Sequence, residues 1–203
     1  MIAGSRNFTV NSPIIFWYRQ DLRIQDLPGL AAAAASGRPI IPCYILDDDT
    51  PGHWRIGAAS RWWLHHSLES LSADLAGYGG QLILRRGDPC AVLVRLAEET
   101  GATDIFCTRM YEPRAAALED KLHTHLATAG VTFRRYGGGL LFEPEAIRTL
   151  DGKPYKVFTP FWRNCLAAAQ PAEPQLLPGD VQWSDEAISS ERLADWNLCP
   201  DQP

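Results

Sequence analysis

The sequence predicts an α/β domain built on a doubly wound, five-stranded parallel sheet of Rossmann-like order, with helices on both faces. The first observation is that short apolar segments alternate with longer segments of helical periodicity between residues 14 and 136. Strict alternation of this kind is typical of a parallel sheet with crossover helices. The second is that polar, charged segments directly follow the first and fourth apolar segments, at 19–23 and 109–112. Ligands of open α/β sheets collect at such strand ends.

The fold prediction starts from the segment between Ile14 and Asp26. Ile14–Tyr18 is a run of β-branched and aromatic residues, which suits a strand that is buried on both faces. A charged loop follows over 19–23, and Asp26 is the expected N-cap of a helix with Pro28 in its first turn. The order is therefore strand, charged loop and helix.

The remaining elements follow from periodicity, glycines and prolines. A second helix is expected because leucines recur at helical spacing between 64 and 75, and Asp88 with Pro89 marks the start of a third. We expect strands at 40–46, 81–86, 104–108 and 131–136, and helices at 57–77, 91–100 and 114–129. The first strand is expected to be central and next to the fourth, so that the loops after both strands form one crevice.

Composition limits the function. The 203 residues are 46% hydrophobic and carry a net charge of −5, which argues against strong nucleic-acid binding by these residues alone. The five cysteines form no C-x-x-C pair, which indicates reduced, packing residues in a cytoplasmic protein and no metal site. No apolar run approaches the roughly 18 residues of a membrane span.

No familiar catalytic motif is present. The glycines at 137–139 follow the fifth strand without the spacing of a dinucleotide fingerprint, and no P-loop or nucleophile elbow occurs. The adjacent His65 and His66 point about 100° apart on a helix, so ordinary surface or packing roles are expected. From the residues alone, the chain is a ligand-binding α/β domain with no catalytic group.

The amino-acid composition changes after residue 154. Tyr155–Trp162 holds four aromatics, with Thr159 as the expected cap of a helix that begins at Pro160; the segment is either a core plug or a contact with another domain. Residues 167–203 are acidic and proline-rich, as in an interdomain linker, yet Trp183 and Trp196 are expected to dock on a surface. The predicted organisation is a flexible extension at 1–12, an α/β domain at 13–166 and a linker at 167–203.

Several motifs together resemble the amino-terminal domain of DNA photolyases and cryptochromes. They occur in the order of that family. They are Trp17-Tyr18-Arg19-Gln20-Asp21-Leu22-Arg23, the helix containing Ser60, Trp63-Leu64-His65 and Ser67-Leu68, Tyr111-Glu112-Pro113, Leu140-Leu141-Phe142-Glu143-Pro144, and Tyr155-Lys156-Val157-Phe158-Thr159-Pro160-Phe161-Trp162. The chain departs from the family at Leu27, where asparagine is common, and at Gln20, where a second basic residue is frequent.

The resemblance implies the amino-terminal light-harvesting domain of a photolyase. Family members repair cyclobutane pyrimidine dimers with light, by electron transfer from a reduced flavin adenine dinucleotide (FAD). That flavin, the DNA-binding face and the tryptophan relay belong to a helical domain that these 203 residues do not include. The residues here are therefore expected to be inactive alone and to meet damaged DNA only through that domain. The alternatives are a cryptochrome-like photoreceptor domain and a stand-alone, non-catalytic nucleotide- or chromophore-binding module.

In the family, the amino-terminal domain can hold an antenna chromophore: a folate, a deazaflavin or flavin mononucleotide (FMN). We expect it in the crevice, because a planar chromophore needs apolar walls and a few polar groups. Trp17 and Tyr18 are expected to add to the walls. The candidate binding residues are Arg19, Asp21, Arg23, Arg109, Met110, Tyr111 and Glu112, with no catalytic or metal-binding residue among them. A purely structural crevice is the alternative.

Overall fold

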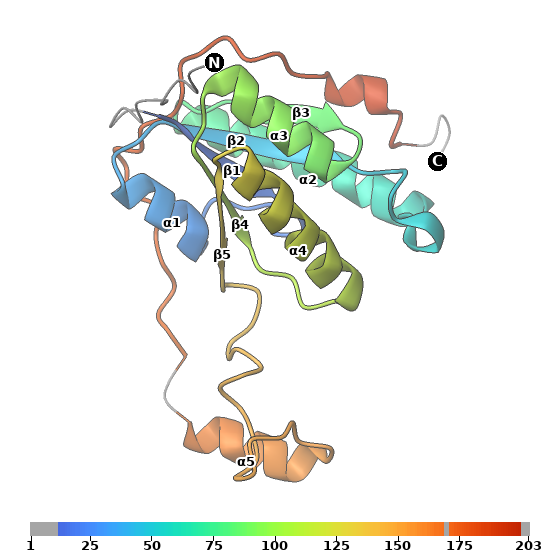
Figure 1. Ribbon diagram of the computed structural model, residues 1–203, viewed down its shortest axis with the longest axis vertical. Helices are drawn as coiled ribbons and strands as arrows, with labels where there is room; N and C mark the ends of the chain where they lie inside the picture. The colour runs from blue at the N-terminus through green and yellow to red at the C-terminus, as the bar shows by residue number, and fades with distance from the viewer. Residues whose placement is uncertain (1–11, 169–170, 200–203) are drawn as a thin grey trace, which may run out of the picture.

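The computed structural model describes residues 12–168 and 171–199, which contain a five-stranded parallel sheet. All of the predicted N-terminal extension except Ser12 lies outside the described residues. The strands are β1 (Ile14–Tyr18), β2 (Ile40–Leu46), β3 (Ile83–Arg86), β4 (Asp104–Thr108) and β5 (Thr132–Tyr136). Their order in the sheet is β3-β2-β1-β4-β5 (Figure 1). The doubly wound sheet is thus confirmed, with the switch point between β1 and β4.

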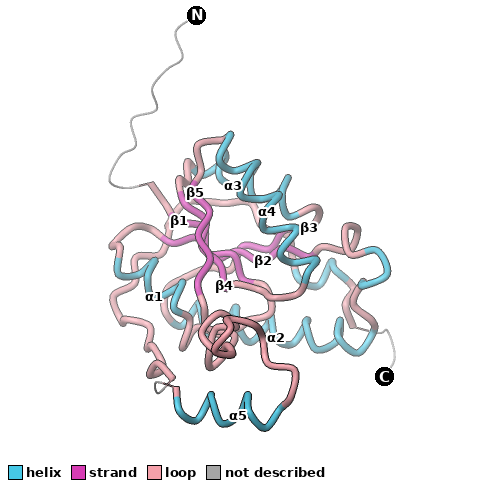
Figure 2. The backbone as a smooth tube through the Cα atoms, turned by 60° about the horizontal axis from the view of Figure 1, so that its bottom comes forward, coloured by secondary structure: helices cyan, strands magenta, loops and turns pink. Residues whose placement is uncertain are grey.

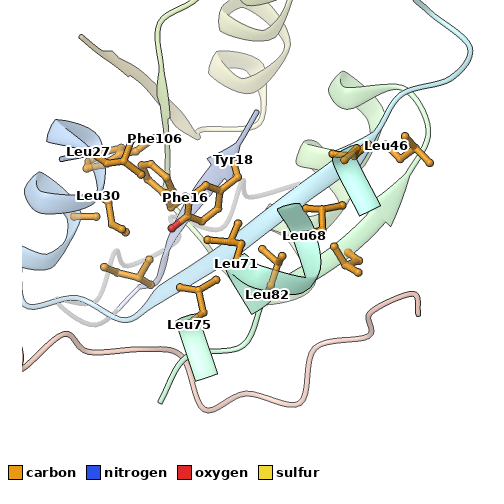
Figure 3. Packing of buried hydrophobic residues seen from close by; sticks show 14 of the residues in the cluster. Phe16, Tyr18, Leu27, Leu30, Leu46, Leu68, Leu71, Leu75, Leu82 and Phe106 are labelled. Carbon is orange, nitrogen blue, oxygen red and sulfur yellow. The ribbon is translucent and has the colours of Figure 1, made fainter. Parts of the chain in front are cut away.

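Strand β1 is central in the sheet, and every one of its residues is buried. Its alternate side chains enter two separate cores, one on each face of the sheet. Phe16 and Tyr18 pack with the leucines of the helices on one face (Figure 3), whereas Ile15 and Trp17 pack with residues of the opposite face. This two-sided burial explains why the segment is apolar without alternation.

Four helices cover the sheet, two on each face. They are α1 (Pro28–Ala35), α2 (Ala58–Gly77), α3 (Pro89–Thr100) and α4 (Pro113–Thr128). Helices α1 and α2 contribute to the core that contains Phe16, and α3 and α4 to the core that contains Trp17 (Figure 1). The predicted elements agree with these bounds to within two residues at each end. The predicted cap at Asp88 is confirmed, since its carboxylate accepts from the Cys90 backbone N–H at 3.2 Å.

The predicted cap at Asp26 is wrong. The N-cap of α1 is Leu27, and no side chain caps the helix. Asp26 has a φ of 55° and pairs instead with Gln175: its N–H donates to the Gln175 carbonyl at 2.8 Å, and its carboxylate accepts from the Gln175 N–H at 3.2 Å. A contact 149 residues away in the sequence therefore replaces the expected local one.

The last helix, α5 (Phe158–Ala167), lies away from the sheet, beyond the carboxyl ends of the strands (Figure 1). The chain runs out to it from β5 and returns afterwards (Figure 2). Helix α5 begins at Phe158, with Val157 as its N-cap, so the predictions of a Thr159 cap and a start at Pro160 are wrong. Phe158 is 70% exposed and Trp162 is 49% exposed, which excludes the core plug within the described residues.

The segment after α5 returns along the sheet and packs on it. Leu177, Trp196 and Leu198 are buried in the core that contains Phe16. The Ile40 N–H donates to the Gln182 carbonyl at 2.8 Å, and the Glu191 N–H donates to the Leu84 carbonyl at 2.9 Å. The second contact covers part of edge strand β3. The expected docking of Trp183 and Trp196 is therefore on this domain; a linker role for the segment stays a prediction.

Two 3-10 turns complete the described elements, η1 (Gly52–Trp54) and η2 (Leu193–Trp196). No helix within 12–168 or 171–199 combines the length and apolar character needed to cross a membrane.

Substitution of Gly80 tests the docking of the tail. A Cβ at Gly80 would meet the Trp183 ring at 2.8 Å, whereas a Cβ at Gly77 has nothing within 4 Å. We expect Gly80→Ala to lower the free energy of unfolding by about 1–3 kcal/mol, because the indole must shift. Urea denaturation followed by tryptophan fluorescence measures it, with Gly77→Ala as the control. Equal stability of the two variants would show that Trp183 does not dock there.

Candidate functional site

A concave pocket of ≈ 350 Å³ opens at the switch point, where the loops after β1 and β4 meet. Its walls contain all seven residues that the sequence singled out. The lining residues are Arg19, Gln20, Asp21, Arg23, Thr108, Arg109, Met110, Tyr111, Glu112, Gly139 and Leu140. We refer to this pocket as the crevice. Its volume is in the range of small-molecule sites.

Buried Glu119 joins both walls of the crevice. This α4 carboxylate is 1% exposed and accepts hydrogen bonds from the guanidiniums of Arg19 and Arg135. It also accepts from the backbone N–H of Met110 at 3.2 Å. Arg19 stacks its guanidinium over the Trp17 ring, 4.7 Å from the centroid. Arg19 is therefore held within the protein, with its charge neutralised, rather than free for a ligand.

Asp21 bridges the same two loops. One of its carboxylate oxygens accepts from the Arg19 backbone N–H at 2.9 Å, and the other accepts from the Thr108 hydroxyl. Thr108 is the last residue of β4 and is buried. Asp21 thus shapes its own loop and fastens it to the neighbouring strand end.

Arg109 and Tyr111 are held by two carboxylates from the segment after β5. Arg109 donates to Glu143 at 3.1 Å and to Glu145 at 2.6 Å, and its guanidinium lies 4.9 Å from the centre of the Tyr111 ring. The Tyr111 hydroxyl donates to Glu143 at 2.8 Å. Burial and this hydrogen bond raise the pKa of Tyr111 to about 12. The pKa of Glu145 is lowered by its hydrogen bond to Arg109.

Arg23 and Glu112, the two remaining candidate residues, differ in how many hydrogen bonds their side chains make within the protein. Arg23 donates to three backbone carbonyls, those of Gln25, Asp26 and Gly138, which joins the first loop to the segment after β5. Glu112 is the N-cap residue of α4, but its side chain makes no capping hydrogen bond. Its carboxylate is therefore available to a ligand.

Trp17 and Tyr18 do not form walls of the crevice, which corrects the prediction. Trp17 is 4% exposed and Tyr18 is fully buried, each in a different core. The reason is that β1 is covered on both faces as far as its last residue. The apolar walls are instead Met110, Tyr111 and Leu140.

Sequence reasoning missed Thr108, Gly139 and Leu140 in the lining, and Glu119 and Glu143 behind it. One signal for Glu119 was available. It lies on α4 between Ala115 and Leu122, at helical spacing on the buried stripe. A carboxylate on an apolar stripe indicates a buried partner.

Two other places were considered as sites. A groove of ≈ 430 Å³ between α3 and α4 has a mixed lining that includes Asp88, Arg95 and Lys121, without convergent polar groups. On α2, His65, His66 and Glu69 bring three possible metal-ligand atoms within 4.8 Å of one another. The buried Nδ1 of His65, however, has no hydrogen-bond partner among the described residues, whereas a histidine that binds a metal through one ring nitrogen normally donates the N–H of the other. The crevice is the better candidate.

Comparison with known proteins identifies the family. The family model described as DNA photolyase matches residues 14–178, which include every strand and helix around the crevice. The chain belongs to the DNA photolyase family. It is 39% identical over 192 residues to a deoxyribodipyrimidine photo-lyase of Agrobacterium fabrum, and 36% identical over 165 residues to cryptochrome-1 of Arabidopsis thaliana. Those matches cover 95% and 81% of this chain, but 40% and 24% of the relatives.

Solved structures agree with this assignment. A class III photolyase from Agrobacterium tumefaciens superposes with a TM-score of 0.88 at 38% identity, over 100% of this chain and 41% of that one. An archaeal photolyase from Sulfolobus tokodaii, described with two FAD molecules, has a TM-score of 0.76 at 22% identity, over 90% and 40% of the two chains, and supports the fold alone. The chain spans about two-fifths of the length of the two Agrobacterium photolyases.

Removal of the Glu119 carboxylate tests the junction beneath the crevice. We expect Glu119→Ala to lower the free energy of unfolding by about 3–5 kcal/mol, because two guanidiniums would lose their buried partner. Chemical denaturation measures the change. Glu98→Ala, on the exposed side of α3, is the control and is expected to change stability by less than about 0.5 kcal/mol. If Glu119→Ala lowers the free energy of unfolding no more than Glu98→Ala does, Glu119 does not hold the two loops together.

Proposed function

We propose that this domain is the light-harvesting-chromophore domain of a DNA photolyase, which repairs cyclobutane pyrimidine dimers when it is joined to a flavin-binding helical domain. Family membership supports the proposal, and one structural observation carries it: a small-molecule-sized crevice at the switch point, with aromatic, apolar and charged walls. Catalysis is assigned to the flavin of the other domain, because membership of the family implies that the flavin carries the chemistry.

The proposed ligand of the crevice is a folate, a deazaflavin or FMN. Tyr111, Met110 and Leu140 would face a planar ring, while Glu112 and Gln20 are placed to orient its polar edge. Arg19, Asp21, Arg23 and Arg109 would act mainly by holding the walls, since each already has protein partners. FAD is proposed for the helical domain alone. A cytoplasmic location is also proposed, supported by five cysteines without disulfides.

A cryptochrome-like photoreceptor is the second candidate. The 36% identity to cryptochrome-1 of Arabidopsis thaliana favours it, because that match covers the same domain. Both candidates share the antenna function of this domain and differ in what the flavin domain does.

Wall substitutions test the antenna proposal. We expect the purified chain to bind at least one of three compounds, a reduced folate, a deazaflavin or FMN. The complex should then show a near-ultraviolet or blue absorption band. Glu112→Ala should weaken that binding about tenfold, the equivalent of losing one hydrogen bond, while far-ultraviolet circular dichroism stays unchanged. Arg109→Ala should weaken it to a similar degree, because Tyr111, Glu143 and Glu145 lose the guanidinium that holds them in the wall. Titration followed by absorbance measures the affinity.

The matched control is Glu98→Ala, which removes a carboxylate outside the crevice. Binding that is unaffected by both wall substitutions would place the chromophore elsewhere on the domain. Absence of a bound band with all three compounds would leave the crevice with a structural role only.

Helix α5 is the proposed contact with the helical domain. Phe158 and Trp162 stack with ring centroids 6.3 Å apart and planes 8° apart, and Leu166 is 67% exposed on the same helix. An apolar surface of this kind indicates a protein partner. The match with the Agrobacterium photolyase leaves about three-fifths of that relative uncovered. We propose that the corresponding part is the protein partner of α5.

Mixing experiments test this contact. We expect the chain to bind the separately purified remainder of the Agrobacterium photolyase, and Phe158→Ser with Trp162→Ser to weaken binding at least tenfold, because the buried aromatic area is lost. Isothermal titration calorimetry measures the affinity. Leu176→Ser, at another exposed apolar residue, is the control. Undiminished binding by the α5 variant would move the contact to another surface.

A further inference from the structure

The charges around Arg109 are unbalanced toward the negative. Its one guanidinium faces two carboxylates, those of Glu143 and Glu145, and Glu112 lies in the same lining. Arg19 does not offset these carboxylates, because it is paired with the buried Glu119, which also binds Arg135. Arg23 lines the crevice as well, but it donates to backbone carbonyls.

Arg109 is suited to bind a phosphate in the crevice, because a guanidinium matches phosphate oxygens in a bidentate manner. Three of its five N–H donors are already used by carboxylates. Glu145 accepts from both of its terminal nitrogens, at 3.2 and 2.6 Å, and Glu143 accepts from one of them at 3.1 Å. We call Glu143 and Glu145 the carboxylate clamp.

Contacts other than the one with Arg109 fix the position of Glu143. Glu143 also accepts from the Tyr111 hydroxyl, and any side chain at Gly137 would meet its Oε1 at 2.6 Å. The Ala146 N–H donates to the Glu143 carbonyl at 2.9 Å, and the adjacent Ile147 is 5% exposed. Displacing Glu143 would therefore break contacts with Arg109 and Tyr111 together.

We propose that Glu143 and Glu145 determine the specificity of the crevice, by occupying Arg109 and so excluding chromophores that would bring a phosphate against it. This inference rests on the proposed antenna function and narrows it. The favoured ligand is a ring system that carries no phosphate. A phosphorylated ligand that approaches Arg109 must either displace the clamp or place its dianion beside these carboxylates, and each course costs affinity.

Ligand pairs that differ only in a phosphate test the proposal. The pairs are riboflavin with FMN, and 5-deazariboflavin with its 5′-phosphate. Affinities are measured by fluorescence titration of the full chain at low salt. We expect the wild-type protein to bind the unphosphorylated member about tenfold more tightly, and the double variant Glu143→Gln/Glu145→Gln to remove that preference. Glutamine keeps the size of each side chain and removes the charge.

The control variant is Glu98→Gln/Glu186→Gln, which changes the net charge by the same amount at exposed residues outside the crevice. It should keep the wild-type preference, since distant charges are screened. High salt should narrow the preference in wild-type protein as well, a measurement that requires no substitution. Glu112→Ala, measured with the same ligands, reports whether binding is in the crevice.

The outcomes separate this inference from the proposed function. If both members of a pair bind the wild-type crevice equally, or if the preference survives in the clamp variant, the clamp does not set specificity and the antenna proposal stands. If no member of either pair binds, the inference is wrong, and the antenna proposal then depends on the folate titration. If binding does not respond to Glu112→Ala, the ligand lies elsewhere and both fail.

Discussion

The crevice depends on one buried carboxylate. Glu119 accepts from Arg19 after β1, from the Met110 backbone after β4 and from Arg135 in β5. Three strand ends are thereby fixed to one helix, at the point where the winding of the sheet reverses. A buried anion without these partners would be strongly unfavourable, so the carboxylate and the walls that surround it stabilise one another.

The walls built on this junction are mostly satisfied by protein partners. Asp21 holds Thr108, Arg23 holds backbone carbonyls, and Arg109 holds the carboxylate clamp. Such a site is preorganised, because its polar groups need little rearrangement when a ligand enters. The same arrangement leaves few unpaired charges for a ligand. A chromophore would therefore meet the shape of the crevice and the carboxylates that face Arg109.

Aromatic residues after β5 are exposed on α5 but partly or fully buried in the segment that follows it. The segment at 171–199 lies against the sheet and buries Trp196, so its apolar residues are already covered. Helix α5 instead lies away from the sheet (Figure 2), and its Phe158 and Trp162 are exposed. The contrast separates residues that complete this domain from residues that are suited to contact another one. Both kinds of residue are aromatic, so composition alone does not distinguish them.

The sequence by itself determined the sheet, its order, the helices and the residues around the crevice, because apolar periodicity and strand-end polarity are local signals. It also determined the family through the order of its motifs, from Trp17 to Trp162. Only the tertiary structure decided which polar groups are free. Asp26 pairs with Gln175 instead of capping a helix, and Glu143 lies against Arg109. These pairings join residues far apart in the chain, and their geometry follows from the packing of the whole domain.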